Sequence, residues 1–151
     1  MIVLDNSVLS AYTRLDRLHL IKDLFGEVII PYGVFEEYTK RWSSEKLTAW
    51  ITVENIEEET ASVSPFLGSG ESQAIMLAQS HDCILALDDE KARDTARNMG
   101  VTLIGSIGIL RLAYETCLID SKTTLRELVE KLEEDLYIEK WLHEWALKAE
   151  K

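Results

Sequence analysis

The apolar residues of the chain fall into short continuous runs that alternate with longer segments of helical periodicity. Each run is too short for a helix and is bounded by polar residues, glycine or proline, which is typical of a buried strand. Strands that are apolar on both faces favour a parallel sheet covered on both sides. The runs are Ile2-Val3-Leu4, Val28-Ile29-Ile30, Cys83 to Leu87 and Val101 to Ile104, and a further brief strand is expected at Ile51-Thr52-Val53.

The segments between these runs predict helices. Asn6 or Ser7 can cap a helix that enters at Val8, because both side chains accept hydrogen bonds from free backbone N–H groups. Helical spacing then continues until Gly26, and Pro31 opens the next helix. The other predicted helices cover residues 42–51, 71–80 and 91–99, and two or three segments from residue 107 onward, of which the last carries Trp141 and Trp145 on one face.

The alternation of strands and helices predicts the fold class. It indicates an α/β domain, a three-layer α/β/α sandwich whose central sheet is mainly parallel. A length of 151 residues is close to the commonest single-domain size. We therefore expect one domain over residues 1–151, with residues 120–151 as a C-terminal helical extension packed on it.

Composition and charge narrow the class of protein. The net charge of −11 argues against a protein that grips duplex DNA through a broad basic face. No apolar run approaches the roughly 20 residues needed to cross a bilayer, and the first residues predict a strand instead of a signal peptide. We expect a cytoplasmic protein with no membrane association. Cys83 and Cys117 lack metal-type spacing, so reduced thiols are expected and zinc is not.

Acidic and hydroxyl side chains follow the predicted strands. Asp5 ends the first strand, Asp88 and Asp89 end the most strand-like run, and Ser106 follows the last strand. In sheets of this kind the functional crevice lies beyond the carboxyl ends of the strands. The predicted helices add two further acids at this edge, Glu37 and Glu71.

Each of these acids also has a simpler interpretation. Asp5 and the Asp88-Asp89 pair can cap helices, Glu71 can favour a helix N-terminus, and Glu37 can face solvent. Carboxylates gathered in one crevice, however, repel one another unless a cation compensates them. Mg²⁺ and Mn²⁺ prefer oxygen ligands of this type, so together the acids favour a divalent metal site.

A set of motifs in chain order resembles the PIN-domain family, and within it the small prokaryotic branch related to VapC-type toxins. The set is fairly specific as a whole, although each piece alone is weak, and it covers about residues 1–119. The stretches are Val3 to Leu9, Leu24 to Pro31 with Val34 to Glu37, Gly70 to Ile75, Leu85 to Asp89 with Ala92-Arg93, and Gly105 to Leu110.

The resemblance implies a role for each matching position. Asp5, Glu37, Glu71 and Asp89 correspond to the acidic catalytic residues and metal ligands of the family, with Asp88 as an added ligand or a supporting partner. Ser7 resembles the hydroxyl residue that supports the first aspartate, and Ser106 the one after the final strand. Glu37 matches better than Glu36 because of its interval from Val34. Arg93 and Arg97 are possible contacts to RNA phosphates, or otherwise surface arginines of an amphipathic helix.

The activity implied by the resemblance is that of a Mg²⁺- or Mn²⁺-dependent endoribonuclease that cleaves single-stranded RNA through a metal-activated water. The resemblance also implies a homodimer and an antitoxin protein as a partner, so the chain could be the toxin of a toxin–antitoxin pair. One position departs from the pattern, because this branch usually carries a lysine where the chain has Tyr114.

Other functions fit the sequence less well. Aspartate-phosphorylating phosphatases need a second Asp where this chain has Ser7, and receiver domains place their acidic pair after the first strand and a lysine after the last. The main alternative is a catalytically weak or inactive PIN-like protein that serves as a binding or scaffold module. Trp42, Trp50, Trp141 and Trp145 can pack within the fold or form an interface.

Overall fold

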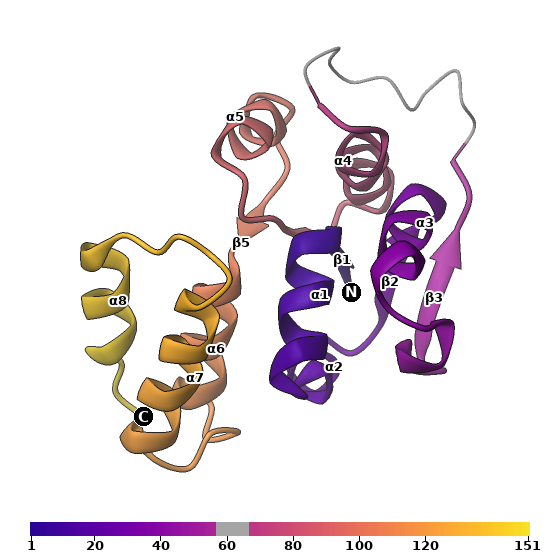
Figure 1. The fold of residues 1–151 in the computed structure, drawn as a ribbon. Coiled ribbons are helices and arrows are strands. Elements are labelled where there is room, and N and C mark those ends of the chain that lie inside the picture. The colour runs from indigo at the N-terminus through magenta and orange to yellow at the C-terminus, as the bar shows by residue number, and fades with distance from the viewer. Residues whose placement is uncertain (57–66) are drawn as a thin grey trace.

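A computed structural model describes residues 1–56 and 67–151 of the protein, and Figure 1 shows its arrangement of helices around a central sheet. The five strands are all parallel and lie in the order β3-β2-β1-β4-β5. Helices flank the sheet, so the predicted three-layer α/β/α class is confirmed. The strands are β1 (Ile2–Leu4), β2 (Val28–Pro31), β3 (Ile51–Glu54), β4 (Ile84–Ala86) and β5 (Leu103–Ile104).

The helices of the described residues connect these strands and form the C-terminal part. They are α1 (Asn6–Leu15), α2 (Leu18–Phe25), α3 (Tyr32–Arg41), the 3₁₀ turn η1 (Ser44–Lys46), α4 (Ser69–His81), α5 (Glu90–Asn98), α6 (Ser106–Glu115), α7 (Lys122–Glu133) and α8 (Lys140–Leu147). No helix of the described part is long and apolar enough to span a membrane.

The central position of β1 determines where a site can form. Ile2 pairs with Val28 of β2 on one side and with Ile84 of β4 on the other. The chain winds from β1 outward to β3, then returns and winds from β4 to β5 in the opposite direction. The carboxyl ends of β1 and β4 therefore flank the switch point of the sheet, which is the usual place for a ligand crevice.

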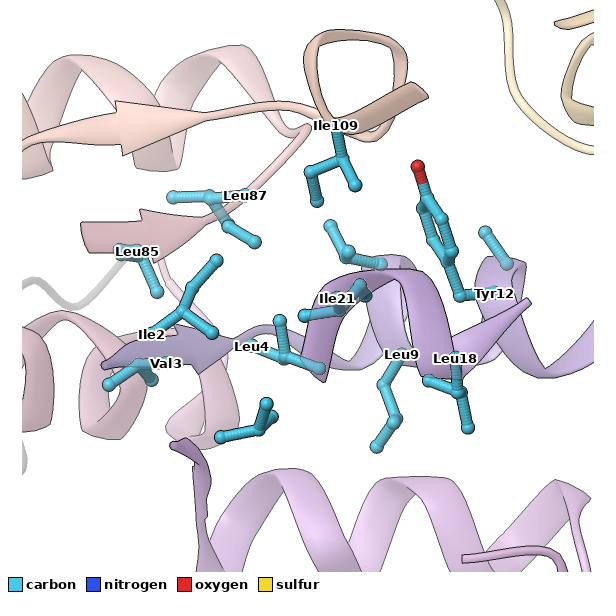
Figure 2. Close-up of a cluster of buried hydrophobic side chains, with 14 of the residues drawn as sticks. Ile2, Val3, Leu4, Leu9, Tyr12, Leu18, Ile21, Leu85, Leu87 and Ile109 are labelled. Carbon is cyan, nitrogen blue, oxygen red and sulfur yellow. The ribbon is translucent and has the colours of Figure 1, made fainter. Parts of the chain in front are cut away.

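The core explains why the short apolar runs become strands. Every residue of β1 and β2 is buried, and all of them except Pro31 are at least 99% buried. Figure 2 shows Ile2 and Leu4 of β1 beside Leu85 and Leu87, with Tyr12 of α1 and Ile109 of α6 next to them. Strands that are buried on both faces need no polar alternation, as the sequence predicts.

The structure corrects the predicted start of the first helix. Asp5, and neither Asn6 nor Ser7, is the N-cap of α1, because the Asp5 carboxylate accepts from the backbone N–H of Ser7. The helical spacing up to Gly26 is divided into two helices. Asp16 ends α1 in the left-handed conformation (φ 56°), which aspartate tolerates better than most residues.

The helix predicted over residues 42–51 is wrong. A single 3₁₀ turn forms there, and Ser43 caps it by accepting from the N–H of Glu45. Trp42 lies in extended backbone and its ring stacks on Tyr38, with the ring centroids 6.3 Å apart. The charge-rich connection predicted after Val53 falls partly outside the described residues.

Smaller differences concern element ends. Pro31 is the last residue of β2 and the N-cap of α3, so α3 begins one residue later than predicted. Helix α4 begins at Ser69 and therefore includes Gly70 in its first turn. Three helices follow β5, where two or three were predicted, and α7 and α8 pack against α6. Whether residues 120–151 form a separate extension stays a prediction.

Candidate active site

Asp5 lies directly after β1, and the fold holds it in a fixed position. It is only 5% exposed, and its Oδ2 accepts from the Ser7 hydroxyl at 2.8 Å and from the Ser7 N–H at 3.3 Å. Burial raises the pKa of the Asp5 carboxyl, the hydrogen bonds from Ser7 oppose that rise, and the charge of Asp88 adds to it. Asp5 thus caps α1 at the same edge of the sheet where the sequence predicts the site.

Asp88 follows β4 and is tied to the first residue of α6. Its two carboxylate oxygens accept from the Ser106 backbone N–H at 2.8 Å and from the Ser106 hydroxyl at 2.6 Å. The Tyr12 hydroxyl, which is fully buried, donates to the Ser106 carbonyl at 2.8 Å. Burial, followed by the charge of Asp88, raises the pKa of Tyr12 well above its usual value.

Tyr12 therefore supports this part of the site, a role that the sequence does not indicate. An aromatic residue on the apolar face of a predicted helix is expected in the core, and most of Tyr12 does lie there (Figure 2). One hydrogen bond links Tyr12 to Ser106, which lies 94 positions further along the sequence. Periodicity alone cannot reveal a contact of such long range.

Asp89 is more exposed than its neighbour. It is the N-cap of α5, and its Oδ1 accepts from the Ala92 N–H at 2.9 Å. The simple capping interpretation thus holds for Asp89, as it does for Asp5. In both cases the cap lies after a strand end at the switch point of the sheet, so capping does not exclude a second role.

Glu37 and Glu71 approach from two helices that pack on each other, α3 and α4. A methyl group placed on Gly70 would lie 2.2 Å from Glu37 Oε1, so the absence of a side chain at Gly70 makes room for this carboxylate. The Gly70 N–H also donates to Glu37. Glu36, in contrast, is exposed. The structure therefore supports Glu37 over Glu36 as the acid that faces α4.

Charge interactions show that these acids act on one another. Burial raises the pKa of Glu71 to about 7, and the carboxylates of Asp5, Asp89 and Glu37 contribute to that rise. Burial, followed by the charge of Asp5, also raises the pKa of Glu37, although the Gly70 N–H and Lys40 oppose this. Carboxylates from β1, α3, α4 and the β4–α5 connection are thus near enough to repel one another.

The donor set suits a hard divalent cation. All five acids offer oxygen ligands, which Mg²⁺ and Mn²⁺ prefer, and several carry charges that a cation would neutralise. The acids are not closed around a common point, since within residues 1–56 and 67–151 no three His, Cys, Asp or Glu side chains already form a group that could hold a metal ion. The fit of these residues to a metal ion therefore rests on the type of donor atom and on the repulsion between the carboxylates. The roles of the five acids as metal ligands stay predictions.

A groove of about 780 Å³ adjoins this cluster. Ser7, Asp88, Asp89 and Ser106 line part of it, together with residues of α5 and of the α7–α8 region. The two arginines predicted to contact phosphates also line it, but both have protein partners. Arg93 donates to the Leu87 carbonyl, and Arg97 pairs with Asp94 at 3.0 Å.

Comparisons with known proteins agree with this architecture. A family model described as PIN domain matches residues 1–150. The structure is similar to that of a PilT N-terminus domain protein, SSO1118, from the hyperthermophilic archaeon Sulfolobus solfataricus P2, with a TM-score of 0.57. The two sequences are 17% identical, and the match covers 91% of this chain and 98% of that chain, so the likeness concerns the fold. A search of curated proteins found no match.

Proposed function

The chain belongs to the PIN-domain family, whose fold is of the nuclease type, and from this premise we propose that it is a Mg²⁺- or Mn²⁺-dependent endoribonuclease that cleaves single-stranded RNA. One observation carries the proposal. Burial raises the pKa of Glu71 to about 7, and the charges of three further acids from other elements, Asp5, Asp89 and Glu37, add to that rise. Repulsion between the carboxylates destabilises the fold unless a bound cation compensates it. Strongly shifted pKa values of this kind are typical of functional sites.

Each side chain has a proposed role. Asp5 and Asp89 would bind the metal directly, Glu37 and Glu71 would orient the metal or the attacking water, and Asp88 would act as an added ligand or as support. A divalent ion in such a site supplies Lewis-acid activation of water and neutralises charge that develops on the phosphate. Ser7 and Ser106 hold Asp5 and Asp88 by hydrogen bonds of 2.8 Å and 2.6 Å, which fixes these carboxylates before substrate arrives.

The protonation of Glu71 is suited to this chemistry. A carboxyl group with a pKa of about 7 can accept a proton from water and release it again near neutral pH. Metal binding would lower that pKa, because a nearby positive charge favours the carboxylate. We therefore expect activity to increase from mildly acidic to neutral pH.

The alternative is a PIN-like binding or scaffold module with weak or no turnover. Two observations favour it, the net charge of −11 and the absence, among the described residues, of acids already arranged around a metal position. A homodimer and an antitoxin partner are also part of the proposal for the active enzyme. If the chain is a toxin, the antitoxin partner would inhibit its RNA cleavage.

The test is cleavage of fluorescent single-stranded RNAs of varied sequence by the purified chain with Mg²⁺, with Mn²⁺ and with EDTA. The proposal predicts cleavage that needs the metal and is lost in Asp5→Asn. Folded protein that binds the metal but cleaves none of the RNAs would support the scaffold alternative. Cleavage that persists in both EDTA and Asp5→Asn would indicate a contaminating nuclease.

A further inference from the structure

Three large aromatic side chains are exposed beside the acidic cluster. Tyr137, Trp141 and Trp145 are 93%, 61% and 40% exposed and line the same groove as Asp88 and Asp89. Their connection between α7 and α8, and α8 itself, lie on the side of β5 and α6 in Figure 1. Clustered exposed aromatics next to a polar site are typical of a binding surface.

The two tryptophans are held differently within this surface. The Arg111 guanidinium lies 4.2 Å from the centre of the Trp145 ring and donates to the Trp145 carbonyl at 2.9 Å, so one face of this ring is covered. Trp141 lies one helical turn earlier, and its indole N–H donates to Glu139. Trp141 is therefore the more accessible of the two rings and is tethered at one edge.

We propose that this groove binds the nucleotides next to the scissile phosphate by stacking their bases on Trp141 and Tyr137. The inference rests on the proposed function, because it assigns the occupant of a groove that is continuous with the catalytic cluster. Only unpaired bases can stack in this way, so the groove would select single-stranded RNA. Base stacking would then contribute more to the affinity than contacts to the phosphates.

The charge of the protein supports this mode of recognition. A net charge of −11 and the acids Glu90 and Glu139 in the groove oppose the binding of many phosphates. An aromatic ring face carries no net charge, so stacking is available where electrostatic attraction is not. Arg97 is exposed and lines the groove, so it could contact one phosphate in exchange for its pairing with Asp94 at 3.0 Å.

The test measures RNA binding separately from cleavage. The Asp5→Asn protein is titrated with a short fluorescein-labelled single-stranded RNA in Mg²⁺, and anisotropy gives the Kd over a range of salt concentrations. We expect Trp141→Ala in this background to weaken binding roughly tenfold, as loss of one base-stacking ring does elsewhere. Trp141→Phe, the matched control, retains a ring and should keep most of the affinity. The dependence of log Kd on log salt should be shallow.

Several outcomes would overturn the inference. Unchanged affinity in Trp141→Ala, or a steep salt dependence, would show that phosphate contacts dominate. Absence of RNA binding by Asp5→Asn would remove the groove as an RNA site, while metal-dependent cleavage by the unmodified protein would still uphold the proposed function. A dimer of the unmodified chain that Trp141→Ala converts to a monomer, measured by sedimentation, would assign the groove to a second copy.

Discussion

Four of the five acids of the candidate site form two sets that are held in different ways, while Asp89, the N-cap of α5, belongs to neither. Asp5 and Asp88 each accept hydrogen bonds from both the hydroxyl and the backbone N–H of a serine. Glu37 and Glu71 project from helices, and the main influences on their pKa are burial and the neighbouring carboxylates. Hydrogen bonds at strand ends and helix starts hold Asp5 and Asp88 in place. The pKa values of Glu37 and Glu71 instead respond to burial and to the charge around them.

This difference indicates a division of work within the site. In the proposed metal site, the fixed carboxylates would define where a cation binds, because their oxygens are oriented without it. The two glutamates lie on longer, more flexible side chains, and burial and the charge of Asp5 raise the pKa of both. Binding of a cation should therefore move the side chains of Glu37 and Glu71 more than those of Asp5 and Asp88.

The largest expected effect comes from Asp5→Asn, in the fixed set. The amide oxygen can still accept from Ser7, so the cap on α1 should survive. RNA cleavage should fall by at least about 100-fold, because loss of mere supporting partners of metal ligands already costs 10–100-fold. The melting temperature without metal should not fall, since a buried charge near Asp88 is removed. Steady-state kinetics and thermal melts measure both quantities.

Asp23→Asn is the matched control for this change, because Asp23 is an exposed acid on α2. It should leave cleavage unchanged. Full activity of Asp5→Asn at equal metal concentration would contradict the role of the fixed set.

Gly70→Ala tests the responsive set without removing an acid. The added methyl group would lie 2.2 Å from Glu37 Oε1, so the carboxylate must move. We expect cleavage to fall by up to about 100-fold, which is the loss that a misplacement of about 1 Å can cause. The free energy of unfolding should not decrease, since alanine is favoured over glycine in a helix by up to about 1 kcal/mol. Gly68→Ala, with nothing within 4 Å of the new methyl group, serves as control.

Ser106→Ala should have a smaller effect. It removes the hydroxyl that donates to Asp88 at 2.6 Å but keeps the backbone N–H that donates at 2.8 Å. Loss of one supporting hydrogen bond predicts a decrease in cleavage of roughly tenfold. Tyr12→Phe, one hydrogen bond further from Asp88, should reduce activity less. If Tyr12→Phe reduced cleavage more than Ser106→Ala, the order of support described here would be wrong.

The pH dependence of stability should show the smallest effect. The pKa of Glu71 is raised from 4.5 to about 7, so the folded protein binds this proton more tightly than the unfolded chain does. Without metal, the stabilising contribution is complete below about pH 4.5 and is lost as the pH rises to about 7. The melting temperature in EDTA should therefore decrease over this window, and Mg²⁺ should reverse the decrease. Glu71→Gln should flatten the curve.

The sequence predicted the fold well because its signals are local. Continuous apolar runs such as Ile2 to Leu4 need no distant partner to indicate a buried strand, and the all-parallel sheet follows from their alternation with helices. The prediction failed at residues 42–51, where only the 3₁₀ turn Ser44–Lys46 forms and Trp42 lies in extended backbone.

The site could be predicted only as a list of residues. Strand ends indicated Asp5, Asp88 and Asp89, and the family resemblance selected Glu37 and Glu71. The sequence also offered Asp5 as a helix cap, but it did not reveal that Gly70 makes room for Glu37 or that Tyr12 supports Ser106. Each of these depends on how separate elements pack, so only the three-dimensional structure shows it.

The most direct test of the account is calorimetric titration of Mn²⁺ into the unmodified protein and into Asp5→Asn, at a pH below and a pH above the pKa of Glu71. The account predicts that the unmodified protein binds Mn²⁺ more tightly at the higher pH, that binding releases protons at the lower pH, and that Asp5→Asn binds weakly at both. Equal affinity of the two proteins for Mn²⁺, without any dependence on pH, would contradict the assignment of these carboxylates to a metal site.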